Sequence, residues 1–129
     1  MICRPLRITA GALVACIAFA SLGCESSTVC AALPAWALEI TVIDSITRVT
    51  PAATSTLTVR DSDFVEVDTD SLAQRNRPFT FVAANGRPGV YSVLIQTPGY
   101  RDWSANDLVV HAKQCGVKTV KLTALLQTD

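Results

Sequence analysis

Short runs of alternating apolar and polar residues, each closed by a turn signal, dominate the chain from Trp36 to Leu126. Alternation with a period of two buries one face of a strand and leaves the other face more exposed. The apolar rows are Leu38, Ile40 and Val42; Leu57 and Val59; Val65 and Val67; and Tyr91, Val93 and Ile95. No stretch of this region combines helical periodicity with helix caps. The pattern therefore predicts an all-β fold, a seven-stranded antiparallel β-sandwich.

Residues suited to tight turns separate these runs. They are Asp61-Ser62-Asp63, the segment 85–89 and Pro98-Gly99, and their side chains or backbone freedom favour turns. Further strands are predicted at 79–84, 108–111 and 117–126. The polar segment 70–78 is predicted to be the longest loop.

The first 23 residues have the composition of a secretory signal. Arg4 and Arg7 precede the segment 8–24, which contains no charged residue and is mostly apolar. This segment is shorter than the stretch of about 20 apolar residues that a membrane-spanning helix needs. We therefore assign residues 1–23 to a signal peptide helix, 24–35 to a tether and 36–129 to one domain.

Cys24 is the predicted site of lipid attachment. The sequence Ser21-Leu22-Gly23-Cys24 resembles the lipobox of bacterial lipoproteins, in which a small residue precedes the cysteine that becomes the acylated N-terminus. Ser21 departs from the Leu that lipoboxes prefer. The resemblance implies an exported protein anchored by lipid to the cell membrane or the outer membrane. Two alternatives stay open: cleavage after Ala20, which would give a secreted or periplasmic protein, and an uncleaved anchor.

The remaining cysteines suit one disulfide. Cys3 and Cys16 lie in the signal segment, and lipidation of Cys24 leaves Cys30 and Cys115 as a pair. A cysteine pair in an exported domain predicts a disulfide. This bond would close a loop of 86 residues, counted from position 30 to position 115. In the chain-entropy model such a loop contributes roughly 4–5 kcal/mol of stability.

The charge balance argues against a polyanionic partner. The whole chain carries 11 basic and 11 acidic side chains, and residues 1–23 contain two of the basic ones and none of the acidic ones. The mature protein is therefore mildly acidic. Nucleic acids and anionic head groups require a basic surface, so no nucleic-acid partner is predicted.

The sequence contains no recognisable catalytic constellation. His111 is the only histidine, and no Gly-x-Ser-x-Gly element accompanies it. A nucleophile needs a base and an orienting group, and zinc needs three or four ligands. We therefore predict no catalytic residue, no metal ligand and no cofactor, and a protein that is not an enzyme.

Five acidic residues gather within ten positions, at Asp61, Asp63, Glu66, Asp68 and Asp70. Clustered carboxylates can bind calcium. An EF-hand loop needs Gly at its sixth position, where Glu66 stands. A solvated strand face with acidic turns is the favoured interpretation, and a calcium site is the alternative.

An ordered series of motifs resembles the carboxypeptidase regulatory-like domains. The series comprises Val42-Ile43-Asp44-Ser45 with Thr47, then 57–61, then 87–93, and finally Pro98-Gly99-Tyr100-Arg101-Asp102-Trp103. The resemblance implies a transthyretin-like (prealbumin-like) seven-stranded sandwich. Those domains usually have a Thr-Gly turn after the first strand, whereas this chain has Thr47-Arg48. Arg takes a positive φ less readily than Gly, so the turn is expected to differ in type.

The resemblance also bears on function. The hydroxyisourate hydrolases of the same fold use several histidines and a C-terminal Tyr-Arg-Gly-Ser motif, and this chain has neither. We expect a non-catalytic, lipid-anchored interaction module of the cell envelope that binds an unknown protein or glycan in trans. The alternatives are a structural envelope protein without a specific ligand and a glycan- or peptide-binding domain. Tyr100 and Trp103 are the candidate ligand contacts, although scaffolding is the favoured role for both, and Trp36 is a third aromatic to compare.

Overall fold

The computed structural model describes residues 29–30, 35–72 and 78–129. The predicted signal peptide helix, Cys24 and most of the tether lie outside the described residues. None of the described residues forms a helix that is long and apolar enough to cross a bilayer.

Nine strands account for most of the described chain, which confirms the predicted all-β fold. They are β1 Trp36–Asp44, β2 Thr54–Asp61, β3 Phe64–Ser71, β4 Phe79–Asn85, β5 Gly89–Gln96, β6 Trp103–Val110, β7 Ala112–Lys113, β8 Gly116–Val117 and β9 Val120–Leu126.

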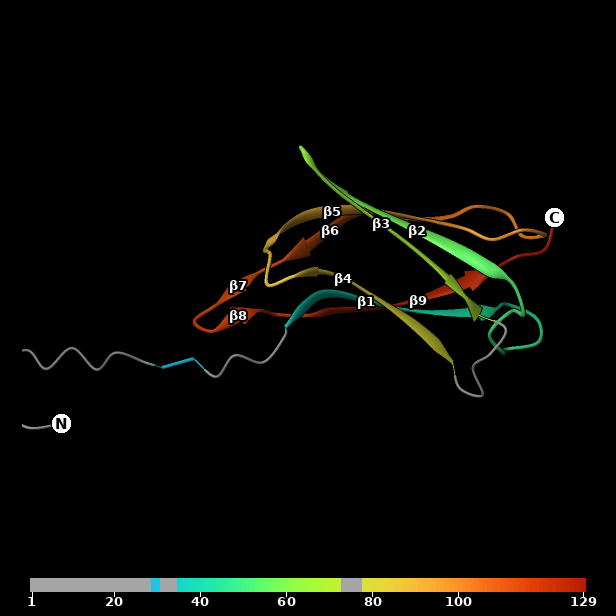
Figure 1. Cartoon of the computed structure of the whole chain (residues 1–129), viewed down its shortest axis with the longest axis horizontal. Coiled ribbons are helices and arrows are strands. Elements are labelled where there is room, and N and C mark those ends of the chain that lie inside the picture. Colours follow the sequence, from blue (N-terminus) through green and yellow to red (C-terminus); the bar gives the residue numbers. More distant parts are fainter. Residues whose placement is uncertain (1–28, 31–34, 73–77) are drawn as a thin grey trace, which may run out of the picture.

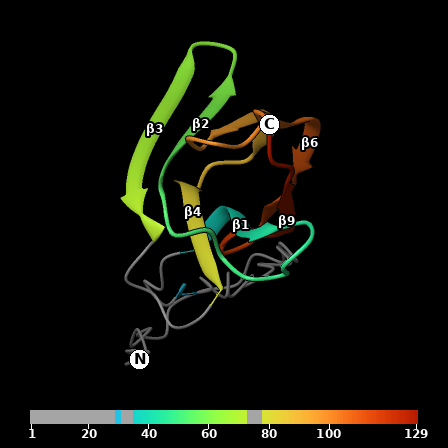
Figure 2. The same ribbon diagram turned by 90° about the vertical axis from the view of Figure 1, so that its right-hand side faces the viewer.

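Two sheets face each other, and a small hairpin extends from one end (Figure 1). One sheet has the strand order β4-β1-β9, and the other has the order β3-β2-β5-β6. The third sheet is the hairpin of β7 and β8. The view along the long axis shows the hairpin of β2 and β3 leaning away from the shorter sheet (Figure 2).

The core fills the space between the two inner faces. Three of the four apolar rows that the sequence predicted supply most of it, including Leu38, Ile40, Leu57, Val59 and Ile95, each at most 1% exposed. The remaining row does not belong to the core, because Val65 and Val67 are 47% and 61% exposed. β4 adds Phe79 and Phe81, whose rings meet edge to face at 4.7 Å between centroids. Edge-to-face contact is a preferred geometry for aromatic pairs.

One strand pair corrects the prediction of a wholly antiparallel sandwich. β1 and β9 run parallel, with Leu38 beside Val120 and Asp44 beside Leu126. Parallel neighbours require a long connection. The first and last long strands satisfy this requirement because almost the whole domain lies between them.

The strand boundaries also differ from the predicted ones. β6 begins at Trp103 rather than at position 108, and β3 continues to Ser71, the second residue of the segment 70–78 that was predicted as a loop. Both strands lie at sheet edges, where one neighbour is enough and apolar alternation is weaker. Apolar rows in the sequence therefore underestimate the length of edge strands.

Candidate ligand-binding face

The outward face of β2, β5 and β6 forms a polar surface along the long axis of the domain. We call this surface the polar trough. It comprises Thr54, Thr56, Thr58, Arg60, Ser92, Leu94, Gln96, Asp102, Ser104, Asn106 and Asp107. The trough residues of β2 and β5 alternate with the buried rows of the same strands, so the core pattern places them outward. Asp102 directly precedes β6, and Asn106 and Asp107 are consecutive residues within it.

Three open depressions follow one another along the polar trough. The middle and end depressions have volumes of about 110 and 200 Å³, and they share Arg60, Ser92 and Asn106. A third, of about 470 Å³, lies at the opposite end beside Thr97 and Pro98. Small-molecule sites usually enclose about 300–1,000 Å³ and are mostly apolar. Open depressions with mixed polar and apolar linings suit a ligand that lies along the surface and forms hydrogen bonds.

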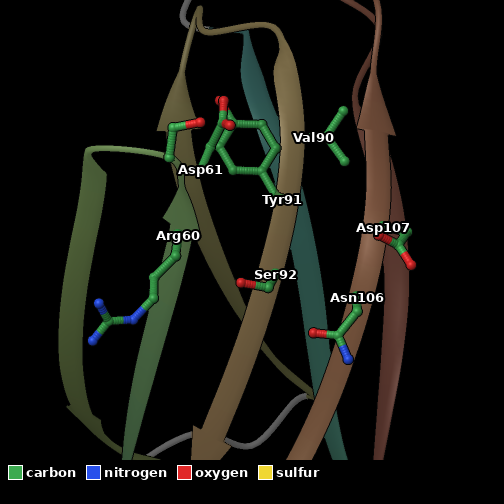
Figure 3. A pocket seen from close by; sticks show the side chains of 8 residues that line it. Arg60, Asp61, Val90, Tyr91, Ser92, Asn106 and Asp107 are labelled. Carbon is green, nitrogen blue, oxygen red and sulfur yellow. The ribbon is translucent and has the colours of Figure 1, made fainter.

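A β-bulge shapes one end of the trough. Tyr91 pairs with Leu108 and Val93 pairs with Ala105, so Ser92 faces two residues, Asn106 and Asp107. Asp107 has a φ of 56°, a left-handed conformation. A bulge of this kind bends the strand and redirects side chains. Figure 3 shows the resulting group, in which Arg60, Ser92 and Asn106 come from three adjacent strands.

The outward face of the other sheet offers a comparison. Its charged groups are paired across strands, with Lys121 Nζ 3.4 Å from Glu39 Oε2. The hydroxyls of Thr41 and Thr80 also bond to each other at 3.0 Å. Exposed pairs of this kind contribute little to stability. The polar trough contains pairs of the same kind: Gln96 Nε2 donates to Asp102 Oδ2 at 3.2 Å, and the Thr56 hydroxyl lies 3.1 Å from that of Thr69. Such pairs therefore do not distinguish the two faces.

Asp44 joins three segments at the end of β1. One carboxylate oxygen accepts the amides of Ile46 and Thr47 at 2.7 and 2.8 Å, and the other accepts the Tyr100 hydroxyl at 2.9 Å. The Thr47 and Ile46 amides, followed by the Tyr100 hydroxyl, lower the pKa of Asp44. The bond to Asp44 and then burial raise the pKa of Tyr100. A buried carboxylate is stable here because every donor favours its charged form.

The predicted aromatic residues lie against the core. Tyr100 and Trp103 are half-buried and pack on the hydrophobic cluster. Tyr91 is 1% exposed, and its hydroxyl donates to the Arg87 carbonyl at 2.7 Å. Burial is the main cause that raises the pKa of Tyr91. Tyr91 is therefore a core residue, whereas Tyr100 and Trp103 keep part of their surface exposed, and their role as scaffold or ligand contact stays a prediction.

The predicted disulfide between Cys30 and Cys115 is confirmed, with a Cα–Cα distance of 5.3 Å. It ties the segment before β1 to the turn of the β7–β8 hairpin. His111 is exposed and lies between β6 and β7.

The five clustered acids spread along the β2–β3 hairpin rather than around a common point. Within residues 29–30, 35–72 and 78–129, no three His, Cys, Asp or Glu side chains are placed so that they could hold a metal ion. In β3 the acids Glu66, Asp68 and Asp70 alternate with Val65, Val67 and Thr69.

Two features of these surfaces were absent from the sequence prediction. The first is the role of Asp44, which was named only as part of the motif Val42-Ile43-Asp44-Ser45. An Asp that ends a strand and precedes two turn residues often accepts their amides, so this signal was present. The second is the bulge at Asn106 and Asp107, for which the local sequence offers no distinct signal.

A scan against protein-family models finds no match for this chain, and a search of curated proteins finds none either.

Proposed function

We propose that this chain is a non-catalytic, lipid-anchored binding module of the cell envelope, and that its ligand lies in the polar trough. The carrying observation is the row of three open depressions, in which hydroxyl, amide and charged side chains from β2, β5 and β6 are interspersed with Val90, Leu94 and Pro98. Such a surface suits a glycan or an extended peptide, because both present many hydrogen-bonding groups along their length.

The proposed architecture is the transthyretin-like sandwich. The two facing sheets of three and four strands support it, as do the buried Tyr91 after Gly89 and the Tyr100 bond to Asp44. Arg48 has a φ of 62°, so the turn after β1 adopts a left-handed residue at the position where the resembling domains have Gly. Contrary to the expectation from the sequence, Arg48 takes the positive φ that Gly would favour, so the substitution in the Thr-Gly motif is compatible with this architecture.

The proposed anchor is a lipid on Cys24, six residues before Cys30. Six extended residues span about 20 Å at most. Because the disulfide ties Cys30 to the β7–β8 hairpin, that end of the domain would face the membrane. The end that carries the C-terminus would face away from it (Figure 1).

Site-specific photo-cross-linking in cells tests the ligand face. Ser104 in the trough and Thr123 on the outward face of β9 are both exposed hydroxyl residues in strands. A cross-linking side chain at position 104 is expected to capture a glycan or protein. The same side chain at position 123 is expected to capture none of the molecules that are captured at position 104. Equal capture at both positions, or none at position 104, would favour the purely structural role.

The anchor needs a separate measurement. Intact mass of the membrane-extracted protein is expected to show an acylated N-terminus at Cys24, and Cys24→Ser is expected to release the protein from the membrane fraction. A mature N-terminus at Ser21 without acyl mass would contradict lipidation and leave the ligand face unaffected.

A further inference from the structure

β3 is an open edge of the four-stranded sheet. It pairs with β2 along its whole length, from Thr54 beside Ser71 to Asp61 beside Phe64. No other strand in the described part of the chain pairs with its far side, which faces outward in Figure 2. A strand edge offers unpaired backbone N–H and C=O groups to another extended chain.

The two faces of β3 differ in chemistry. Its register with β2 places Val65 and Val67 on the outward face of the sheet, beside Arg60 and Thr58. These valines are 47% and 61% exposed. Glu66 and Asp68 lie on the opposite face, beside Val59 and Leu57.

The acidic face of β3 is only lightly covered. Asp68 is exposed, and Glu66 is half-buried with one oxygen bonded to the amide of Ala84 in β4 at 2.8 Å. β3 leans beyond the shorter sheet (Figure 2), which explains how acids can occupy the face that β2 uses for the core.

A second copy of this chain is a poor occupant of this edge. Antiparallel pairing of two β3 strands preserves the two faces, so the acids of one copy would lie opposite the acids of the other. With Asp68 opposite Asp68, for example, Glu66 would lie opposite Asp70. Like charges directly across a strand pair are destabilising, and charged residues at an edge are a known barrier to self-association.

We propose that the β3 edge binds an extended segment of another protein in which cationic and apolar residues alternate. Backbone pairing would place the cationic side chains beside Glu66 and Asp68 and the apolar side chains beside Val65 and Val67. Main-chain bonds would supply affinity, and the alternation would supply specificity. This edge adjoins the polar trough, because Val65 and Val67 lie beside Arg60 and Thr58. Binding at β3 does not depend on a ligand in the trough.

A peptide of nine residues that alternates Lys and Val tests the proposal on the full chain in detergent. We expect binding by the alternating peptide, together with slower amide hydrogen exchange at residues 64–70. A peptide of the same composition with the Lys and Val residues in separate blocks is the matched control. A third peptide carries N-methyl groups at its central residues, so that neither of its edges can pair. Both control peptides are expected to bind at least about fivefold more weakly.

Charge-reversal variants distinguish strand pairing at β3 from general electrostatic attraction between the peptide and the protein. Asp68→Lys is expected to weaken binding of the alternating peptide about fivefold or more, because attraction becomes cross-strand repulsion. Asp129→Lys, the same change at an exposed residue outside the strands, is expected to have a much smaller effect. Equal effects of the two variants, equal binding of the alternating and block peptides, or unchanged exchange at 64–70 would each overturn the proposal. Concentration-dependent dimers with protected β3 amides would do the same and would identify a second copy as the occupant.

Discussion

Asp44 illustrates how one side chain can connect distant parts of this fold. Its carboxylate bonds to two amides of the turn that follows β1 and to the hydroxyl of Tyr100, which lies 56 positions away. Tyr100 is in turn bridged to Thr128 near the C-terminus. A single carboxylate therefore helps to hold the turn after β1, the turn after β5 and the last residues together.

The lowered pKa of Asp44 predicts acid sensitivity. An unfolded Asp titrates near about 3.9. Because the folded pKa is lower, the stabilisation is fully present above the unfolded value and is lost as the pH falls through the folded pKa. Urea unfolding between neutral and strongly acidic pH measures this loss.

Two variants test the assignment to Asp44. Asp44→Asn removes the titrating group. We therefore expect a lower free energy of unfolding at neutral pH and a smaller loss of that free energy as the pH falls. Tyr100→Phe removes one of the three donors. Its loss of unfolding free energy at acid pH should therefore be smaller than that of the parent and larger than that of Asp44→Asn. If Asp44→Asn has the same pH dependence as the parent, another carboxylate is responsible.

At the scale of strands and turns, the sequence predicted buried strands better than edges. Leu38, Leu57, Val93 and Ile95 belong to rows whose period of two directly reflects burial of one face. β6 has no such row in Ser104–Asp107, and its place depends on pairing with β5 rather than on local preference. The parallel contact of β1 with β9 and the bulge in β6 also depend on tertiary structure, so local sequence patterns do not predict them.

The polar trough was unpredictable for the same reason. Its residues come from three separate strands, and only the pairing of β2 with β5 and of β5 with β6 brings them together. The aromatic residues were easier to interpret, because large side chains in a small domain usually pack on the core.

The turn after β1 carries a testable backbone cost at Arg48, whose φ is 62°. A left-handed conformation costs a residue with a Cβ about 1–2 kcal/mol, and Gly loses about 0.5–1 kcal/mol through its greater freedom when unfolded. Arg48→Gly is therefore expected to stabilise the domain by about 0.5–1 kcal/mol. Arg48→Ala is the control, because it removes the exposed side chain and keeps the Cβ.

Equilibrium urea unfolding at neutral pH distinguishes the two variants. The backbone explanation requires a higher midpoint for Arg48→Gly and a nearly unchanged midpoint for Arg48→Ala. Equal midpoints for the two variants would mean that the arginine side chain, rather than its φ, determines the difference.

At the scale of the whole molecule, the disulfide links the start of the domain to the hairpin that precedes its last strand. Cys30 and Cys115 are separated by 85 positions. β1 and β9 also lie side by side in one sheet. The covalent link and the strand pairing therefore connect the same two parts of the chain. Both sulfur-bearing residues are exposed, so the bond is accessible to a reductant.

Loss of this bond is expected to be the most destabilising of the changes considered, because a loop this long constrains the unfolded chain by about 4–5 kcal/mol in the chain-entropy model. Net stabilities of small domains are about 5–15 kcal/mol, so the reduced protein should unfold at a much lower urea concentration. The double variant Cys30→Ser/Cys115→Ser should match the reduced parent and should not respond to reductant. If reduction leaves the urea midpoint of the parent unchanged, the parallel pair of β1 and β9 already holds the two segments together without the disulfide. A lower midpoint for the reduced parent than for the double variant would instead indicate that the free thiols, rather than the lost cross-link, destabilise the domain.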